Sequence, residues 1–541
     1  MKKIKKLLIS ILLVIFLSQS SACFLLFNQN VVDGPHMSER VYQRIDESAV
    51  DNCLQELNLL LTQDGKQEQV IEKRNQFFND YYTKAFTMNT IASINYDKDV
   101  TNEYWQEESV LATNIAQKIQ NDAIKLEQAI LTSEFYGEFF RKELGEEYAD
   151  SILKTETDSE EQLAILEQIS SLEASYSLLY STGDYTTLTK NYIELVNLRN
   201  EYARSKKNAE GNPYNNYLEY AYAQVYGREY TPNEVQTFRT AIRANLLSIR
   251  NDYLNESQNV NYYADEALSE SKVKKIMPEI IKNTVPDMLD SWEYMMEREL
   301  YDFAVSNKKA NTSYVTSFYE YGDAYMFINA SGSILSDLST FIHEFGHYNE
   351  HFMSDKNLTD DNLMSYDLAE THSQAFELIT LDAVKNVLAK NTTTKNLYQS
   401  YVFNLMINSI WSMLSNCIFD EFEYAVYNAN SQDLSASYLN NLFSYIWNKY
   451  WSVSGYKFYD IPHLFLYPGY CISYTVSMVF SFEIWASDNP VNNYVEVVKY
   501  GTGNTLSNVY TNVNLPNPLS ENTVTSIAEK LSTFTFDTFG W

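Results

Sequence analysis

Glycine and proline, the residues that most often interrupt helices, are scarce in this chain. Its 541 residues include 15 Gly and 10 Pro, and no stretch is rich in Gly and Ser or in Pro. Long segments, among them 105–180 and 363–390, place apolar residues at intervals of three and four positions, as one face of an α-helix requires. We therefore predict a mainly α-helical protein, whose length allows one large domain or two to three lobes.

The chain is strongly acidic, with a formal net charge of −31 at pH 7. Binding to nucleic acid draws on a basic surface that releases counterions from the phosphates. The body of the sequence contains no basic patch. We therefore expect no nucleic acid partner.

The sequence His343-Glu344-Phe345-Gly346-His347 has the spacing of a metal site. On a helix, residues four apart lie on one face, so His343 and His347 can direct two imidazoles at one zinc ion while Glu344 projects beside the open coordination position. Five of the six histidines fall between residues 343 and 463. Because a chance match would not gather the histidines in one region, the pattern favours a zinc metallopeptidase.

A catalytic zinc ion has three protein ligands and one exchangeable water, so the two histidines need a partner from another element. Glu370 and Glu377 lie seven residues apart on a predicted helix, and therefore on one face. We assign Glu370 as the third ligand and Glu377 as a carboxylate that orients a ligand histidine. His372 points from another face and His351 lies one turn beyond the motif, and we expect neither to be a ligand.

The segment before the predicted metal-binding helix is rich in aromatic and β-branched residues and ends in small ones. It predicts a strand at Tyr325–Asn329, a turn at Gly332-Ser333, and Ser333 or Ser336 as the helix N-cap. The strand could lie at a sheet edge and pair with an extended peptide. It could equally be an ordinary core strand, and the sequence leaves both interpretations open.

Three blocks in order resemble the thimet oligopeptidase and oligoendopeptidase F family of zinc peptidases. The first two are the HExGH motif at 343–347 and the ExxS motif at 370–373. The third, 461–474, is similar to a family segment in which a His and a Tyr about eleven residues later act on the substrate. The stretch 196–220 also resembles the opening of the family's catalytic region, so the resemblance covers about residues 195–535.

This resemblance implies two largely helical lobes that enclose a deep substrate channel, with a small β-sheet beside the HExxH helix. One zinc ion would be held by His343, His347 and Glu370. Glu344 would be the general base that takes a proton from the water and passes it to the leaving amine. Tyr474 and His463 would donate hydrogen bonds to the tetrahedral oxyanion.

The first residues have the pattern of an export segment. Several lysines precede the uncharged apolar run Leu7–Leu17. Ser21-Ala22-Cys23 resembles the end of a bacterial lipoprotein motif with Cys23 as the lipidated residue, although Ser20 stands where that motif has a larger aliphatic residue. The uncharged stretch also continues through Phe27, far enough for an uncleaved membrane anchor. We predict an extracytoplasmic protein, held by lipid, held by a signal anchor, or secreted.

The remaining cysteines, Cys53, Cys417 and Cys471, form no CxxC pair and are odd in number if Cys23 carries lipid. Such a set does not suggest a disulfide framework, and we expect three buried thiols.

These observations together predict an exported, monomeric zinc oligoendopeptidase that hydrolyses internal bonds of short peptides. We expect an export or anchor segment at 1–29, an N-terminal helical region at 30–194 and a catalytic domain at 195–541. Two alternatives stay open. One is a zinc carboxypeptidase with the same HExxH-plus-Glu architecture, and the other is a surface lipoprotein that binds peptides without catalysis.

Overall fold

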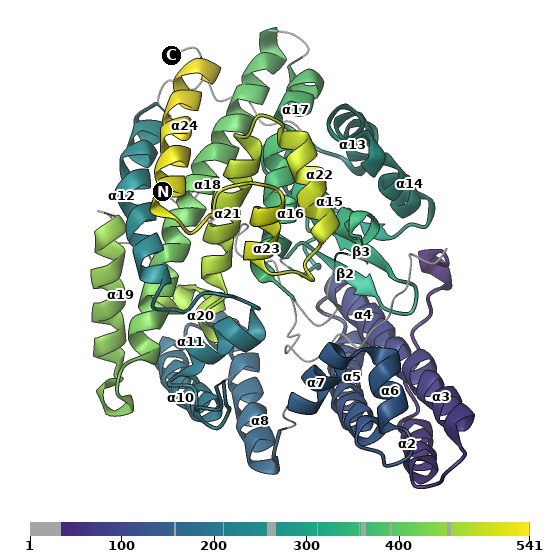
Figure 1. The fold of residues 1–541 in the computed structure, drawn as a ribbon. Coiled ribbons are helices and arrows are strands. Elements are labelled where there is room, and N and C mark those ends of the chain that lie inside the picture. Colours follow the sequence, from purple (N-terminus) through teal and green to yellow (C-terminus); the bar gives the residue numbers. More distant parts are fainter. Residues whose placement is uncertain are drawn as a thin grey trace. The chain divides into compact units, whose positions relative to one another are not determined.

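The computed structural model describes residues 34–155, 158–208, 210–256, 267–310, 312–355, 358, 364–389, 392–451 and 456–539. The chain divides into two compact units, each built from two stretches of sequence. The first comprises 1–157 and 266–356, and the second comprises 158–265 and 357–541. Described residues of both units are mostly helical, and the first also has a small sheet (Figure 1). The prediction of a mainly α protein with a small sheet is confirmed, while the export segment at 1–29 lies outside the described residues.

The first unit contains a bundle of helices from its first stretch and a sheet with further helices from its second. Its helices are η1 (Met37–Glu39), α2 (Glu47–Leu61), α3 (Gln67–Gln76), η2 (Phe77–Tyr82), α4 (Thr83–Lys98), α5 (Glu103–Leu131), α6 (Gly137–Leu144), α7 (Glu146–Lys154), α13 (Glu270–Thr284), η4 (Pro286–Met288), α14 (Leu289–Glu297) and α15 (Ile334–Met353).

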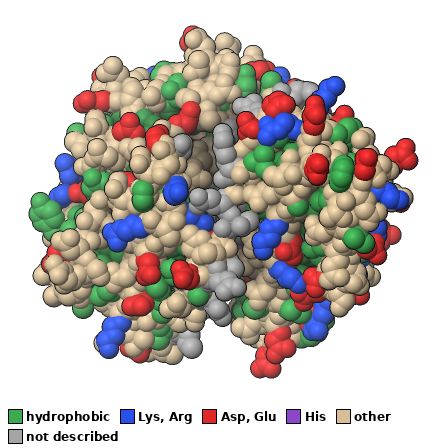
Figure 2. Space-filling model, turned by 60° about the horizontal axis from the view of Figure 1, so that its bottom comes forward, with side chains coloured by type: hydrophobic (Ala, Val, Ile, Leu, Met, Phe, Trp, Pro, Cys, Tyr) green, Lys and Arg blue, Asp and Glu red, His purple; other side chains and the backbone are tan. Residues whose placement is uncertain are grey.

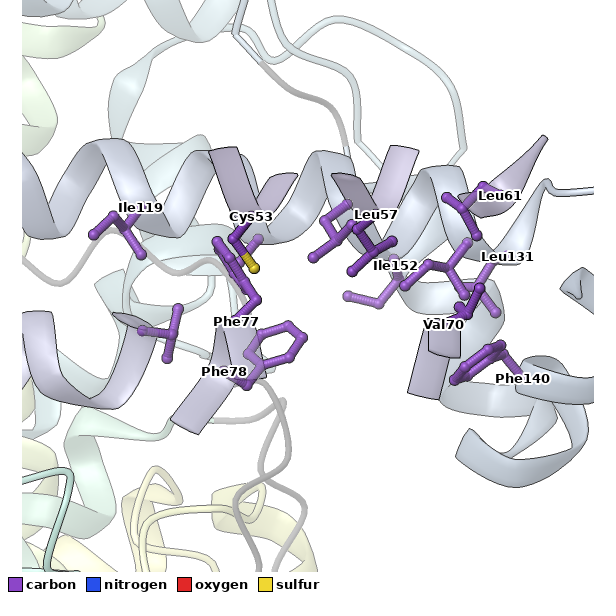
Figure 3. Packing of buried hydrophobic residues seen from close by; sticks show 14 of the residues in the cluster. Cys53, Leu57, Leu61, Val70, Phe77, Phe78, Ile119, Leu131, Phe140 and Ile152 are labelled. Atoms are coloured by element: carbon purple, nitrogen blue, oxygen red, sulfur yellow. The ribbon is translucent and has the colours of Figure 1, made fainter. Parts of the chain in front are cut away.

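The bundle is held together by a hydrophobic core. Figure 3 shows Leu57 and Leu61 of α2, Ile119 and Leu131 of α5, and Phe140 of α6 among the side chains that meet between the helices. All five are buried, and removing such side chains from water is the main favourable contribution to folding. Among its described residues, this bundle holds no group of His, Cys, Asp or Glu arranged to bind a metal.

The sheet has three strands in the order β1-β3-β2. β3 (Asp323–Phe327) pairs in parallel with β1 (Tyr301–Asp302) and antiparallel with β2 (Tyr314–Phe318). A turn in which Gly322 takes a φ of 66° returns the chain from β2, so that the pairing begins at Asp323. The strand therefore starts two residues before the predicted one.

β3 is the central strand, and all of its residues are buried. The interpretation as an edge strand that pairs with a peptide is therefore wrong, and the core-strand alternative is correct. The reason is β1, a strand of two residues that pairs with Met326 and Phe327 on the side of β3 away from β2.

The metal-binding motif lies on α15, which packs against β2 and β3. Ser333 caps the helix by accepting a 3.3 Å hydrogen bond from the amide of Ser336, which decides between the two predicted caps in favour of Ser333. The Asp337 carboxylate accepts hydrogen bonds from the amides of Ser331, Gly332 and Ser333. An acidic side chain in the first turn also favours the helix dipole. The start of α15 is thus fixed by local contacts.

The segment before α2 is attached to this sheet by a buried ion pair. Arg40 donates two 2.7 Å hydrogen bonds to the Asp323 carboxylate, and neither side chain is exposed. Tyr294 donates a further 2.8 Å bond to Asp323. A Cβ at Gly34 would lie 2.6 Å from Asp323 Oδ2, so a larger residue here would displace the Asp323 side chain from this ion pair.

The second unit is built from helices. They are α8 (Glu160–Ala174), α9 (Tyr176–Thr182), α10 (Tyr185–Arg204), α11 (Tyr217–Tyr220), η3 (Ala221–Val225), α12 (Val235–Glu256), α16 (Tyr366–Ile379), α17 (Leu381–Leu388), α18 (Thr392–Tyr427), η5 (Ser431–Asp433), α19 (Ala436–Tyr450), η6 (Phe458–Asp460), α20 (Pro462–Leu466), α21 (Cys471–Trp485), α22 (Pro490–Tyr500), α23 (Leu506–Asn512) and α24 (Glu521–Phe539). α21 packs between α16 and α18, as Figure 1 also shows. α10 runs across the position at which we placed the start of the catalytic domain, and that boundary stays a prediction.

Two further features of the described residues bear on the sequence predictions. The apolar stretch Asn396–Tyr427 of α18 has the length and composition to cross a membrane, but 72% of its most apolar window is buried inside the protein, as in a core helix. Cys53, Cys417 and Cys471 are free and buried, as predicted.

Acidic and basic side chains are interspersed on the face drawn in Figure 2, where the described residues gather no basic patch.

Candidate active site

His343 and His347 lie one turn apart on α15, with ring centroids 5.0 Å from each other. His347 and Glu344 are buried, whereas His343 is half-buried. The helical spacing expected from the sequence is therefore present, and it directs both imidazoles from one face of the helix.

Glu370 lies in the first half of α16 and is completely buried. The helix begins at its N-cap Ser365, whose side chain accepts a hydrogen bond from the amide of Leu368. All fourteen residues of α16 are buried. A carboxylate in such surroundings requires compensating partners, since burying an uncompensated charge is costly.

One ligand atom each from His343, His347 and Glu370 lies within 4.8 Å of the other two. Two imidazoles and one carboxylate are a donor set of catalytic zinc sites, which leave the fourth position to water or substrate. The residues present therefore fit a zinc ion. These are the three side chains predicted as ligands from the sequence.

His463 and Tyr474 lie on α20 and α21, and their ring centroids are 6.0 Å apart. His463 is buried, and neither of its ring nitrogens has a hydrogen-bond partner among the described residues. Burial lowers the pKa of His463 to about 4, so its ring is neutral at pH 7. A neutral imidazole offers one donor and one acceptor. His463 and Tyr474, which the sequence resemblance assigned to the substrate, are thus neighbours.

The sequence of residues 277–529 matches the model of peptidase family M3, and residues 37–157 match the model of the peptidase M3 N-terminal domain. Together these matches cover more than half of the chain. The chain belongs to peptidase family M3. Members of this family are zinc metallopeptidases, and the resemblance found in the sequence is confirmed.

Solved structures share the fold of this M3 peptidase. PZ peptidase A with an inhibitor is 18% identical with a TM-score of 0.74, over 92% of this chain and 98% of that one. A candidate oligoendopeptidase F from Bacillus anthracis is 19% identical with a TM-score of 0.74, over 94% and 100%. A carboxypeptidase from Pyrococcus furiosus is 13% identical with a TM-score of 0.56, over 90% and 100%. No curated protein matches the sequence.

Tyr470 is a residue of this M3 peptidase that the sequence analysis missed. Its hydroxyl donates a 2.8 Å hydrogen bond to Oε1 of Glu370. Burial, with the nearby Glu370 carboxylate, raises the pKa of Tyr470 well above its usual value. The phenol therefore stays protonated and can donate a hydrogen bond. Tyr470 stands inside the third sequence block, but nothing in the spacing of that block showed that it would reach α16.

The structure also describes the other candidates from the sequence. Glu377 is buried on α16, and its assignment as an orienting carboxylate stays a prediction. His372 is also buried, and its carbonyl oxygen accepts a 3.0 Å hydrogen bond from Tyr494. His351 is half-buried, with Nε2 3.4 Å from the hydroxyl of Ser317. Among the described residues, neither histidine joins the group that can hold a metal.

Proposed function

We propose that this M3 peptidase is an exported zinc oligoendopeptidase that hydrolyses internal bonds of short peptides. The observation that carries the proposal is the grouping of His343, His347 and Glu370, with Glu344 next in sequence to the first of them. Those three side chains would hold the ion. When bound, zinc would supply Lewis acidity toward a water molecule and the scissile carbonyl.

Glu344 is the proposed general base. It lies on α15 between the two histidines and is buried, with an exposed fraction of 1%. Its carboxylate accepts a proton from the attacking water and delivers that proton to the nitrogen of the leaving amine. The same side chain therefore serves both halves of the hydrolysis.

Tyr474 and His463 are the proposed donors to the oxyanion. Tyr474 is half-buried, and its phenol can donate one hydrogen bond, as can one N–H of the neutral His463 ring. Donors that are already oriented toward the position where negative charge develops stabilise the transition state more than the substrate.

The substrates are proposed to be short unfolded peptides outside the cytoplasm. The family membership supports peptide hydrolysis, and structures named oligoendopeptidase F share the fold. The pattern of the first 29 residues supports export, with lipid on Cys23 or an apolar anchor as the link to the membrane. We propose that the protein acts as a monomer.

A carboxypeptidase is the second candidate, because a carboxypeptidase is among the structures with the same fold. The two activities differ in their products. An endopeptidase cuts inside a peptide whose C-terminus is amidated, whereas a carboxypeptidase needs the free carboxylate.

The deciding experiment incubates the full-length protein with matched free and amidated peptides, with and without a chelator, and identifies products by mass spectrometry. Internal cuts of both forms, lost with chelator and restored by zinc, are the expected result. Stepwise C-terminal trimming of the free form alone would establish the carboxypeptidase. Intact peptides in the presence of bound zinc would contradict both.

A further inference from the structure

The segment Tyr226–Tyr230 follows η3 and connects two parts of the second unit that carry proposed site residues. One part is the start of α16, which bears Glu370. The other is the turn 468–470, which leads into α21 and Tyr474. Four of its five residues, 226, 227, 228 and 230, contact one or both of these parts.

Tyr226 and Gly227 bring the segment against both parts. The Tyr226 hydroxyl donates a 3.0 Å hydrogen bond to the carbonyl of Pro468 in the turn. Gly227 has a φ of 58°, and a Cβ at this position would overlap the carbonyl oxygen of Met364, just before α16. Only glycine therefore permits this approach.

Arg228 makes the largest set of contacts. Its guanidinium donates to the carbonyl of Gly469 at 2.7 Å, to the carbonyl of Tyr470 at 3.3 Å and to the hydroxyl of Ser473 at 2.7 Å. Its Nε lies 3.6 Å from the carboxylate of Asp367, and both side chains are buried. The planar guanidinium can serve these acceptors at once, whereas a lysine ammonium is a single point of charge.

Asp367 lies on α16 one turn before Glu370, on the same face of the helix. Besides facing Arg228, its carboxylate accepts hydrogen bonds from Tyr230 at 2.9 Å and from Ser473 at 2.5 Å. Ser473 directly precedes Tyr474 on α21. Asp367 therefore connects α16 to both the 226–230 segment and α21.

The turn 468–470 is also held by Glu423 of α18. Gly469 has a φ of 84°, and its amide donates a 3.0 Å hydrogen bond to the Glu423 carboxyl group. Tyr470, the last residue of the turn, donates to Glu370. The position of the turn therefore affects both a proposed zinc ligand and the helix that carries a proposed oxyanion donor.

We propose that Arg228 is a positioning residue of this peptidase, which fixes the start of α16 against the start of α21 and so sets the placement of Glu370 and Tyr474. The inference rests on the proposed function for the role of Tyr474. Its effect on zinc binding can be measured without any turnover.

The test replaces Arg228 with lysine in the full-length protein, which keeps the charge and removes the fork of donors. We expect zinc affinity, measured by competition with a chelating dye, to fall about 10- to 100-fold, as for residues that orient metal ligands. With saturating zinc, kcat on an internally quenched peptide should fall about 100-fold, as a small misplacement of reacting groups produces. KM should change by less than about twofold, because no direct substrate contact is removed.

Arg239→Lys is the matched control. This buried arginine pairs with Asp420 and lies over the ring of Tyr424, and none of its described contacts is with α16 or α21. Both variants should lower the melting temperature, but only Arg228→Lys should change zinc affinity and kcat. Equal effects of the two variants on zinc affinity and kcat would overturn the proposal.

A double variant separates positioning from general damage. If Arg228 acts by placing Tyr474, the loss of kcat in Arg228→Lys/Tyr474→Phe is smaller than the product of the single losses. A loss equal to that product overturns the link to Tyr474. If Arg228→Lys does not fold, Ser473→Ala removes the hydroxyl between Arg228 and Asp367 and should shift the same readouts in the same direction, and unchanged readouts there overturn the proposal.

Wild-type protein that cleaves no peptide would contradict the proposed function, and the zinc competition would still decide the role of Arg228.

Discussion

The hydroxyl of Tyr470 donates a 2.8 Å hydrogen bond to Oε1 of Glu370. A bond of this kind fixes the orientation of a ligating carboxylate. Tyr470→Phe should therefore weaken zinc binding about 10- to 100-fold while the protein stays folded, as measured by chelator competition and circular dichroism. Tyr494→Phe is the control, because the hydroxyl of Tyr494 binds a backbone carbonyl of the same helix. Equal zinc affinities in the two variants would contradict the role of Tyr470.

Glu344→Gln should keep zinc and lose turnover. The amide has nearly the shape of the carboxylate but cannot accept a proton, and general base catalysis contributes about 10²- to 10⁴-fold. Zinc content measured by atomic emission should match the wild type, with kcat lower by that factor. A variant that retained kcat would exclude Glu344 as the base.

Tyr474→Phe should lower kcat about 10²- to 10³-fold and leave KM nearly unchanged, because an oxyanion donor acts mainly in the transition state. Tyr467→Phe is a matched control, since its ring also lies 6.0 Å from that of His463. Steady-state kinetics on one quenched peptide gives kcat and KM for both variants. A rise in KM at constant kcat would assign Tyr474 to substrate binding instead.

His463 should make stability depend on pH. Burial lowers its pKa from 6.5 to about 4, so the unfolded chain binds a proton in this range while the folded chain does not. Its contribution to stability is therefore present above pH 6.5 and is lost as the pH falls toward 4, by roughly 3 kcal/mol in total. Urea unfolding at pH 7.5 and pH 4 should show a drop for the wild type that is larger by this amount than for His463→Gln. Parallel drops would disprove the shift.

Arg40→Ala should destabilise the first unit strongly. It leaves the Asp323 carboxylate buried and without its ion-pair partner, a change that costs about 3–5 kcal/mol. Lys308 forms an ion pair with Asp99, but the Lys308 side chain is 61% exposed. Lys308→Ala should therefore lower the free energy of unfolding by less than about 1 kcal/mol. Denaturant unfolding measures the free energy of unfolding of both variants. Similar losses would show that the Arg40 pair is not important for stability.

Sequence patterns predicted those features that depend on neighbouring residues. The HExxH spacing and the Ser333 cap are local to one helix, and both are present. The central position of β3 could not be predicted, because it depends on a two-residue strand with no pattern of its own. Tyr470 and Arg228 were missed for a similar reason, since their partners on α16 are distant in sequence and no periodicity marks such contacts.

α16 has no solvent-exposed face: each of its residues, from Tyr366 to Ile379, is buried. A substitution at any of its positions must therefore fit a filled space and satisfy the polar groups around it. Deep mutational scanning of this helix should reveal a continuous block of intolerance, without the three- to four-residue rhythm of permissive sites found along surface helices. Libraries intended to retarget this peptidase would accordingly do better to leave α16 constant and diversify segments that contact solvent.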